Sequence, residues 1–361
     1  MLTGNKGEWS EIYTLLKLIA DGEMLKGDSQ LTPIPGERYK VIALERHEAT
    51  TGVTSYMING DDVAICNAKE SKTCNRETFK TEATRLLEII KSKSATFDIP
   101  RIEAFMNEIL TFSIKAKSQD KTDIKVEIID HRTNISHARG FSIKSQLGSP
   151  STLLNASGHT LFDYKIDGLS ESDKTKINSI SGNRYVQKRV SKIEKLQSSG
   201  ELSIHDGRAR SEIFMHNLVL LDDALPDILA SLIYNGYKHR KSQLNELLPH
   251  LVNDNIRDYQ FSDNSTVYSQ KIKRLLVASA LGMKPASIWE GQYDASGGYL
   301  IVLNDGNIIS YHIYDKEDFE NYLFYNTRLD TPSPKRYHSG EITTADGCHY
   351  MQLGLQIRFC L

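Results

Sequence analysis

The chain has 361 residues, of which 39% are hydrophobic and 25% charged, fractions that exclude a fibrous repeat and a chain disordered throughout. It has neither an apolar run of about 18 residues nor a basic, apolar leader, so we expect a cytoplasmic protein without a membrane span. With 44 basic and 46 acidic side chains, the net charge of -2 gives no global attraction for nucleic acid, which local basic patches would have to supply.

The first part of the chain alternates between helix and strand patterns. Trp9, Ile12, Leu16 and Ile19 recur every three to four residues and predict an amphipathic helix. The pattern then predicts strands at residues 39–44, 53–58 and 63–66 and helices at residues 77–94 and 101–110. Alternation of polar and apolar residues over 122–129 and 141–147 predicts two strands that form a pair.

From about residue 174 the pattern is mainly helical. Helices are predicted at residues 184–197, 211–221, 225–234, 242–252, 265–281 and 317–323, and strands at 299–303, 308–313 and 351–359. We therefore expect an α/β protein of the α+β type, with a mixed central sheet flanked by helices and with additional helical and β elements. The change of pattern predicts a division near residue 170, into parts that span residues 1–170 and 171–361.

The predicted strand pair also carries a polar pattern. Because side chains on a strand alternate between its faces, Asp123 shares a face with Glu127, and Ser142 shares one with Lys144 and Gln146. A carboxylate and an ammonium on neighbouring strands, about 4.8 Å apart, can flank a divalent cation and a water, as phosphodiester hydrolysis requires. Asp123 and Glu127 lie about 13 Å apart along one strand, too far to ligate one ion. The same pattern is also typical of a solvated strand face.

Signatures of several other enzymes are missing from the sequence. It contains no Walker A loop, no Gly-x-Ser-x-Gly elbow and no His-Glu-x-x-His helix, which argues against those ATPase, hydrolase and zinc-protease classes. Cysteines at positions 66, 74, 348 and 360 lack the paired Cys-x2-Cys spacing of zinc sites, so we expect scattered reduced thiols.

Residues 5–11 (Asn-Lys-Gly-Glu-Trp-Ser-Glu), 121–124 (Lys-Thr-Asp-Ile), 140–145 (Gly-Phe-Ser-Ile-Lys-Ser) and 151–157 (Ser-Thr-Leu-Leu-Asn-Ala-Ser) form four ordered blocks. These blocks resemble the HpaII family of type II restriction endonucleases, which belongs to the PD-(D/E)xK nuclease superfamily. The resemblance implies a PD-(D/E)xK nuclease-like core in residues 1–170, and a region 171–361 that completes the fold and contributes DNA contacts. It also implies Mg2+-dependent cleavage of both strands of double-stranded DNA at a short palindrome, with CCGG as the leading target and 5′ overhangs as products. A homodimer is the economical arrangement for a palindrome, although a monomer that acts twice stays open.

Carried over residue by residue, the resemblance implies that Asp123 is the metal-binding aspartate of the superfamily motif and that Lys144 is its lysine. Ser142 occupies the position that usually holds a second acid, two residues before that lysine. This departure from the motif leaves one metal ligand to be found elsewhere in the chain.

Three residues could take over the role of the acid that is absent at position 142. Many nucleases of the superfamily use an acid from an N-terminal helix, so Glu8 is our preferred second metal ligand. Glu11 lies on the same face of the predicted helix and is the alternative. Gln146 shares the face of Lys144, and its amide could orient the water or reach a phosphate.

Candidates for DNA contact come from a helix and a loop. Arg184, Lys188 and Lys192 recur at helical spacing, and such a stripe either follows DNA phosphates or is a solvated helix face. Asn155 and Ser157 follow the catalytic strands closely, and they either lie at the DNA groove or only cap and turn the chain.

Guanine is most often read by arginine, and Arg208, Arg210 and Arg336 are the candidates, which the sequence does not rank. Two other functions stay open for the whole chain. One is a structure-selective DNA repair nuclease or junction resolvase on the same core. The other is a non-catalytic DNA-binding module, in which the serine at position 142 marks a lost active site.

Overall fold

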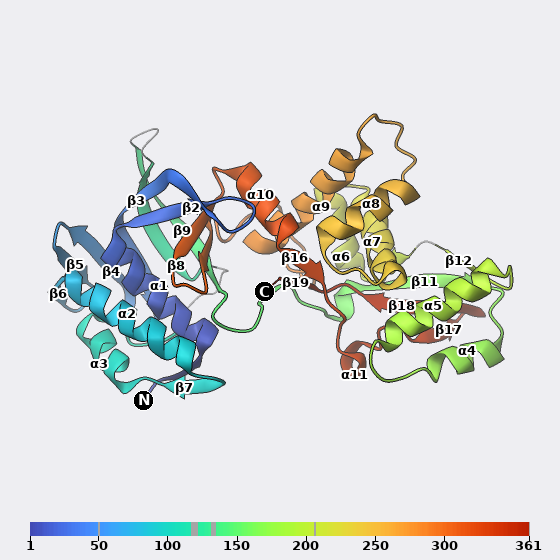
Figure 1. The fold of residues 1–361 in the computed structure, drawn as a ribbon, viewed down its shortest axis with the longest axis horizontal. Helices are drawn as coiled ribbons and strands as arrows, with labels where there is room; N and C mark the ends of the chain where they lie inside the picture. The colour runs from blue at the N-terminus through green and yellow to red at the C-terminus, as the bar shows by residue number, and fades with distance from the viewer. Residues whose placement is uncertain (50, 117–121, 131–134, 206, 361) are drawn as a thin grey trace. The chain divides into compact units, whose positions relative to one another are not determined.

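The computed structural model describes the chain except residues 50, 117–121, 131–134, 206 and 361 (Figure 1). It packs as two compact units. The first unit consists of Met1–Ser151 and Tyr293–Tyr322, and the second of Thr152–Gln292 and Leu323–Cys360. The chain therefore leaves the first unit and later returns to it. This division differs from the single boundary that we expected near residue 170, because the later segment pairs with strands of the first unit.

The first unit begins with one helix and a series of strands. In chain order its elements are β1 (Thr3–Asn5), α1 (Lys6–Asp21), β2 (Glu23–Gly27), β3 (Pro33–Glu48), β4 (Gly52–Asn59), β5 (Asp62–Cys66), β6 (Ser71–Asn75), α2 (Arg76–Ser92), β7 (Thr96–Asp98), α3 (Pro100–Glu108), β8 (Ile124–Asp130) and β9 (Ile135–Ser145). The returning segment adds β14 (Gly298–Val302), β15 (Ile308–His312) and the first part of α10 (Lys316–Tyr325).

Nine strands of the described chain form the main sheet of the first unit, in the order β2-β15-β14-β9-β8-β3-β4-β5-β6. Because β2 also pairs with β3, the six strands from β2 to β3 close into a ring. The long strand β3 makes this possible, since its first half pairs with β2 and its second half with β4. β9 lies between β8, which is antiparallel to it, and β14, which is parallel.

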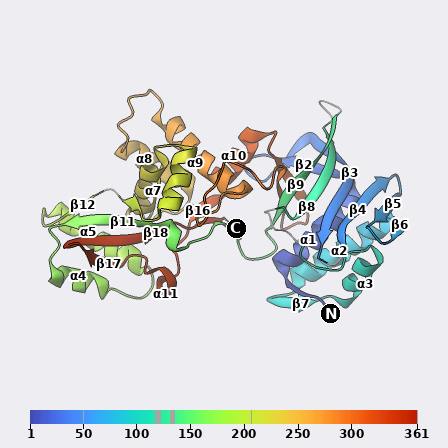
Figure 2. The ribbon, with the colours of Figure 1, turned by 180° about the vertical axis from the view of Figure 1, so that it is seen from behind.

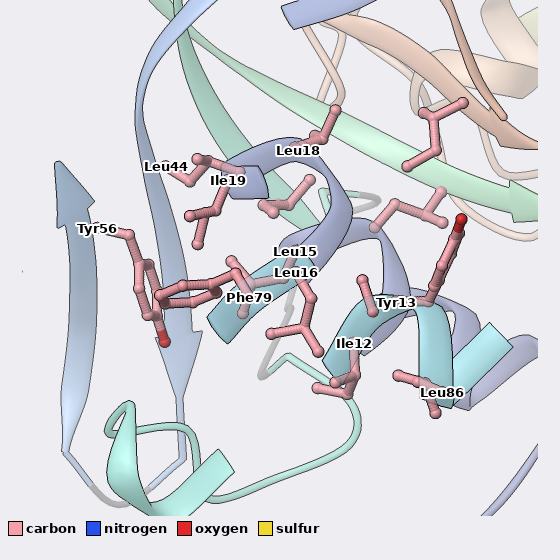
Figure 3. Packing of buried hydrophobic residues seen from close by; sticks show 14 of the residues in the cluster. Ile12, Tyr13, Leu15, Leu16, Leu18, Ile19, Leu44, Tyr56, Phe79 and Leu86 are labelled. Atoms are coloured by element: carbon pink, nitrogen blue, oxygen red, sulfur yellow. The ribbon is translucent and has the colours of Figure 1, made fainter. Parts of the chain in front are cut away.

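Helices α1 and α2 cover one face of this sheet (Figures 1 and 2). The apolar stripe of α1 is fully buried, and Ile12, Leu16 and Ile19 are each 0% exposed. Figure 3 shows this stripe beside Tyr56 of β4 and Phe79 of α2, which are also fully buried. Each buried side chain of this size stabilises the fold by about 1.5–3 kcal/mol relative to an exposed one. Helix α1 is therefore firmly fixed to the sheet.

The second unit contains most of the helices. In chain order its elements are β10 (Thr152–Leu154), η1 (Gly158–Thr160), β11 (Leu161–Asp167), α4 (Glu171–Asn178), α5 (Tyr185–Ser198), β12 (Ser203–Ile204), β13 (Arg208–Ala209), α6 (Glu212–Leu221), α7 (Leu225–His239), α8 (Leu244–Asp254), α9 (Asn264–Leu281), β16 (Thr327–Leu329), α11 (Pro334–Tyr337), β17 (Ile342–Ala345), β18 (Cys348–Gly354) and β19 (Ile357–Phe359). One sheet has the order β12-β11-β18-β17, with β13 also paired to β11, and another has the order β10-β19-β16.

The mixed α/β class expected from the sequence is confirmed, and the predicted helices of the second unit are present with ends shifted by a few residues. The single strand predicted over residues 351–359 is wrong. Those residues belong to β18 and β19, which pair in different sheets because the chain turns between Gly354 and Ile357. No helix in the described part of the chain has the length and hydropathy that a membrane-spanning segment needs.

Candidate active site

Asp123, Ser142 and Lys144 form a hydrogen-bonded run where β8 begins and β9 ends. The antiparallel register of the two strands places Asp123 beside Ser142. Ser142 Oγ donates to Asp123 Oδ2 at 3.1 Å, and Lys144 Nζ donates to Ser142 Oγ at 2.9 Å. The backbone N–H of Ile143 donates to the same carboxylate oxygen at 2.7 Å. The strand pair therefore brings the aspartate and the lysine together, with the serine between them.

Lys144 lies in the interior of the sheet, since β9 has a neighbour on each side. In the parallel pair with β14, Tyr299 lies opposite Ser142. The Nζ atom of Lys144 is 5.1 Å from the centroid of the buried Tyr299 ring. Burial lowers the pKa of Lys144, and the negative charges of Asp123 and Glu11 partly counteract this effect. A cation in such surroundings is poorly screened by water, so it would interact strongly with a phosphate.

Glu8 lies in the first turn of α1, where it completes a capping box. Asn5 Oδ1 accepts from the backbone N–H of Glu8 at 3.1 Å, and Glu8 Oε2 accepts from the backbone N–H of Asn5 at 2.7 Å. The other carboxylate oxygen pairs with Lys115 Nζ at 2.7 Å. Burial acts to raise the pKa of Glu8, but the bonds from Lys115 and Asn5 outweigh it, so the pKa lies below its ordinary value. Both carboxylate oxygens of Glu8 thus have structural partners.

Glu11 lies one turn further along α1 and lines the same cleft as Lys144. Burial and the charge of Asp123 raise the pKa of Glu11 to about 7, and the positive charges of Arg46 and Lys115 offset only part of that rise. Its only backbone donor among the described residues is the N–H of Ala116, at 3.4 Å. Of the two glutamates, Glu11 is the one whose charge interacts with Asp123 and Lys144, while both line the same cleft as Lys144. Both glutamates lie on helix α1, so they differ in the groups that surround them in the folded protein.

A buried ion pair holds the segment that contacts both glutamates. Arg46 and Glu48 of β3 pair with each other, and their side chains are 2% and 0% exposed. Glu48 Oε2 accepts from the backbone N–H of Phe112 at 3.1 Å and from Ser113 Oγ at 2.8 Å, and Arg46 Nη2 donates to the backbone carbonyl of Ile114 at 2.6 Å. The segment that follows supplies Lys115 and Ala116 to the site, so sequence reasoning missed a pair that positions it.

A cleft of about 960 Å³ opens beside these groups in the first unit. Its walls include both glutamates and Lys144, and its rim carries further cationic and hydroxyl side chains, among them Lys6, Lys93, Lys115, Ser149 and Ser151. A second hollow of about 630 Å³ is lined by Asp123 together with Lys125 and Arg139. The hydrogen-bonded run is thus reached from two hollows of the same unit, one at Lys144 and the other at Asp123.

Ser142 and Gln146 do not supply the missing acid. Ser142 is 3% exposed, and its hydroxyl is engaged by Asp123 and Lys144. Gln146 follows the end of β9, and its Oε1 accepts from the backbone N–H of Asn304 at 3.3 Å. Neither side chain lines the two hollows just described.

The donors at this site suit a divalent cation of the magnesium type. Within the described residues, no cluster of three or more Asp, Glu, His or Cys side chains could hold a metal by itself. Mg2+ is usually bound by one or two carboxylates and completes its shell with water and substrate phosphate. Asp123 and Glu11 offer two such carboxylates. The raised pKa of Glu11 means that its negative charge lacks full compensation, which a cation would supply.

Two of the DNA-contact candidates lie on the loop after β10 in the second unit. The side chain of Ser157 accepts from the backbone N–H of His159 at 3.1 Å, and the backbone N–H of Ser157 donates to Thr160 Oγ1 at 3.0 Å. Ser157 therefore begins the short helix η1, which is the capping role considered from the sequence. Asn155 on the same loop is exposed.

The predicted basic stripe begins at Arg184, the residue before α5, and continues along that helix. Arg184 and Lys188 are exposed, and Lys192 is partly buried. Arg189, on the other face of this helix, is 9% exposed and donates to backbone carbonyl groups of neighbouring segments. The stripe is therefore a solvent-facing side of α5, where DNA phosphates or water can contact it.

The three arginines considered for base reading divide into two places. Arg208 and Arg210 both line a pocket of the second unit, and both are exposed to solvent. Arg336 lies on the short helix α11, is also exposed, and does not line that pocket.

Comparison with known proteins supports one family for the whole chain. Residues 5–359 match the model of the HpaII restriction endonuclease family. The chain is also 39% identical over 361 residues to the type II restriction enzyme HpaII of Haemophilus parainfluenzae, an alignment that covers 99% of this chain and 98% of that enzyme. No solved structure matches the chain significantly. Because both matches extend over both units, this chain belongs to the HpaII family of type II restriction endonucleases.

Proposed function

We propose that this enzyme hydrolyses phosphodiester bonds of double-stranded DNA with Mg2+, and that a homodimer cuts both strands of a short palindrome. CCGG is the leading target, and 5′ overhangs are the expected ends. The observation that supports this proposal most directly is the run of Asp123, Ser142 and Lys144 with Glu11 beside it. Two acids and one lysine at one place are what metal-assisted phosphodiester hydrolysis requires.

Each group at the site has a separate role in this mechanism. Asp123 and Glu11 would hold Mg2+, which when bound would polarise the phosphate and lower the pKa of a bound water. Lys144 Nζ donates to the scissile phosphate and stabilises the negative charge that develops there. The hydroxyl of Ser142 accepts from Lys144 and donates to Asp123, so it keeps the lysine and the aspartate in register. Ser142 is a positioning residue in this scheme.

We also propose that the first unit has a PD-(D/E)xK nuclease-like core. Support comes from the helix α1, the antiparallel pair β8 and β9, and the parallel neighbour β14, which together place the acid and the lysine side by side. In this chain Ser142 occupies the position, two residues before the lysine, where the motif usually has an acidic residue. Glu11 of helix α1 supplies the negative charge that this position lacks.

The homodimer follows from the symmetry of the proposed target. A palindrome presents the same sequence on both strands, so two copies of one chain related by a two-fold axis can each cut one strand. The described residues contain one such run of Asp123, Ser142 and Lys144 per chain. Two chains would therefore supply the two cuts.

Digestion of a plasmid of known sequence tests the proposal. We expect discrete fragments with Mg2+ and none with a chelator, and sequencing the fragment ends gives the target and the cut position together. Random nicking, or cleavage that needs no divalent cation, would contradict the proposal. Cleavage confined to branched DNA would instead favour the repair nuclease or resolvase, and binding without cleavage would favour the DNA-binding module. Sedimentation with the target duplex should show two chains per duplex.

A further inference from the structure

The second unit has a pocket of about 870 Å³ that the proposed chemistry does not use. Arg208 and Arg210 form part of its wall, next to Asp163 of β11. Helix α6 adds an apolar side, with Val219 49% and Leu220 52% exposed. A wall that combines an exposed apolar surface with clustered hydrogen-bond donors is unusual for a solvated surface and typical of a binding site.

The two arginines line one pocket but have different partners. Arg208 lies in β13 and Arg210 directly follows it; both line the pocket, while Ala209 between them is buried. Asp163 is the direct cross-strand partner of Arg208 in the pairing of β11 with β13. Its carboxylate nevertheless binds Arg210, which donates from Nε at 2.9 Å and from Nη2 at 3.0 Å.

Most N–H donors of the Arg210 guanidinium group form hydrogen bonds within the protein. With its side-chain amide oxygen turned toward Arg210, Gln352 of β18 accepts from Nη1 at 2.6 Å and from Nη2 at 3.2 Å. Arg208 has no ion pair among the described residues, because the opposite carboxylate is occupied. One arginine is therefore fixed, and the other lines the pocket without a carboxylate partner in the described part of the chain.

We propose that Arg208 reads a guanine of the DNA target, a proposal that rests on the proposed function. Arginine presents parallel N–H donors that match the two acceptors N7 and O6 of guanine in the major groove. Arg210 acts through Asp163: by holding that carboxylate it leaves Arg208 unpaired, so Arg210 is a positioning residue. Base recognition then belongs to the second unit and phosphodiester hydrolysis to the first.

The proposal is tested by binding without Mg2+, which separates recognition from cutting. The probes are the target duplex found by digestion, a scrambled duplex, and the target with 7-deazaguanine, which lacks N7. We expect Arg208→Ala to weaken binding of the target about tenfold to 100-fold, and to change binding of the scrambled duplex less than about threefold. The wild-type protein should distinguish guanine from 7-deazaguanine, and Arg208→Ala should not. The matched control is Arg240→Ala, an exposed arginine at the end of α7 in the same unit, which should behave as wild type.

The positioning role of Arg210 has its own test. Arg210→Ala should also abolish the distinction between guanine and 7-deazaguanine, because Asp163 is then free to pair with Arg208. The double variant Asp163→Ala/Arg210→Ala should restore that distinction, which a merely structural role of Arg210 would not do.

The outcomes separate this inference from the proposed function. Equal weakening of target and scrambled duplexes by Arg208→Ala would identify a phosphate contact and overturn the inference. An unchanged target preference in Arg208→Ala, together with normal cleavage by the wild type, would also overturn the inference and leave the proposed function intact. A wild-type protein that binds target and scrambled duplex equally without Mg2+ would overturn the inference, whereas a digestion that yields no discrete fragments would contradict the proposed function.

Discussion

The two units place their charged side chains differently. In the first unit, the side chains of Arg46 and Glu48 are buried, and burial shifts the pKa values of Glu11 and Lys144. In the second unit, most candidate cations, including Arg208, lie in solvent. Hydrolysis needs charges that are desolvated and fixed in place, whereas contact with a long polyanion needs charges that can be reached. The following predictions test whether the contrast between the units corresponds to cutting and reading.

Breaking the buried pair should have the largest effect on the first unit. We expect Glu48→Ala to lower the free energy of unfolding by about 3–5 kcal/mol, because it leaves the Arg46 charge buried without a partner. The measurement is urea unfolding followed by fluorescence of Trp9, which is buried in this unit, in a Trp289→Phe background. Glu45→Ala is the control.

Glu45 lies on the same strand, but it is 40% exposed in its pair with Lys125, so its loss should cost less than about 1 kcal/mol. Equal effects of the two variants would mean that burial does not distinguish these pairs. The contrast between the units would then lose its physical basis.

Removing the lysine should affect cutting and leave binding unchanged. We expect Lys144→Met, which keeps the aliphatic stem, to slow single-turnover cleavage about 100- to 1,000-fold, because the charge on the phosphate loses its donor. Binding of the target without Mg2+ should stay near the wild-type value. Lys72→Met, on the edge strand β6, where the lysine side chain is 41% exposed, is the control and should cut normally. A variant that loses binding and cutting in equal measure would place recognition in the first unit as well.

Glu11 should make both activity and stability depend on pH. Its pKa is raised from an ordinary 4.5 to about 7, so it is protonated below that pH and cannot hold a cation. We therefore expect Mg2+ affinity to rise as the pH rises through about 7. Mg2+ titrations at several pH values measure this, and Glu11→Gln should remove the dependence. A dependence that persists in this variant would assign it to another group.

The same pKa has a consequence for folding. A carboxyl group with a raised folded-state pKa stabilises the protein below its unfolded pKa, and this contribution is lost as the pH rises through about 7. Without metal, Glu11→Gln should therefore be more stable than wild type at pH 8, by up to roughly 3 kcal/mol, and no more stable at pH 4. Urea unfolding at the two pH values decides this, and a gain that is equal at both would contradict it.

Glu8→Gln should have the smallest effect, and it distinguishes the two glutamates. We expect a loss of about 1 kcal/mol in stability, because the variant weakens the capping box and the pair with Lys115. Cleavage should stay within about threefold of wild type, since Glu8 is bound to structural partners. A collapse of cleavage would return the role of metal ligand from Glu11 to Glu8.

The sequence predicted the elements that bury one face of their own residues. Helix α1 and strand β8 each bury one face, which leaves a period in the sequence. The same signal exists in β11, where Phe162, Tyr164 and Ile166 are buried in alternation, although we did not predict that strand. Closure of the ring was beyond sequence reasoning, because it depends on a pairing between residues as distant as Leu25 and Ile309.

The site was predictable to a similar extent. Period two placed Asp123 and Lys144 on adjacent strands, and the resemblance gave their proposed roles. The sequence could not predict which of Glu8 and Glu11 is the better candidate for the metal ligand, because both lie on one face of α1. They differ in the folded chain, where Lys115 pairs with Glu8. The ranking of Arg208 over Arg210 likewise depends on which of them captures Asp163.

The late return of the chain to the first unit has a consequence for the cell that makes this enzyme. β14, with Tyr299, is synthesised only after the entire stretch from residue 152 to residue 292. Until the ribosome has passed that strand, β9 lacks one of its neighbours and Lys144 lacks its aromatic support. We expect prematurely terminated chains to be inert toward the chromosome, so translation errors would not release a partial enzyme that damages DNA.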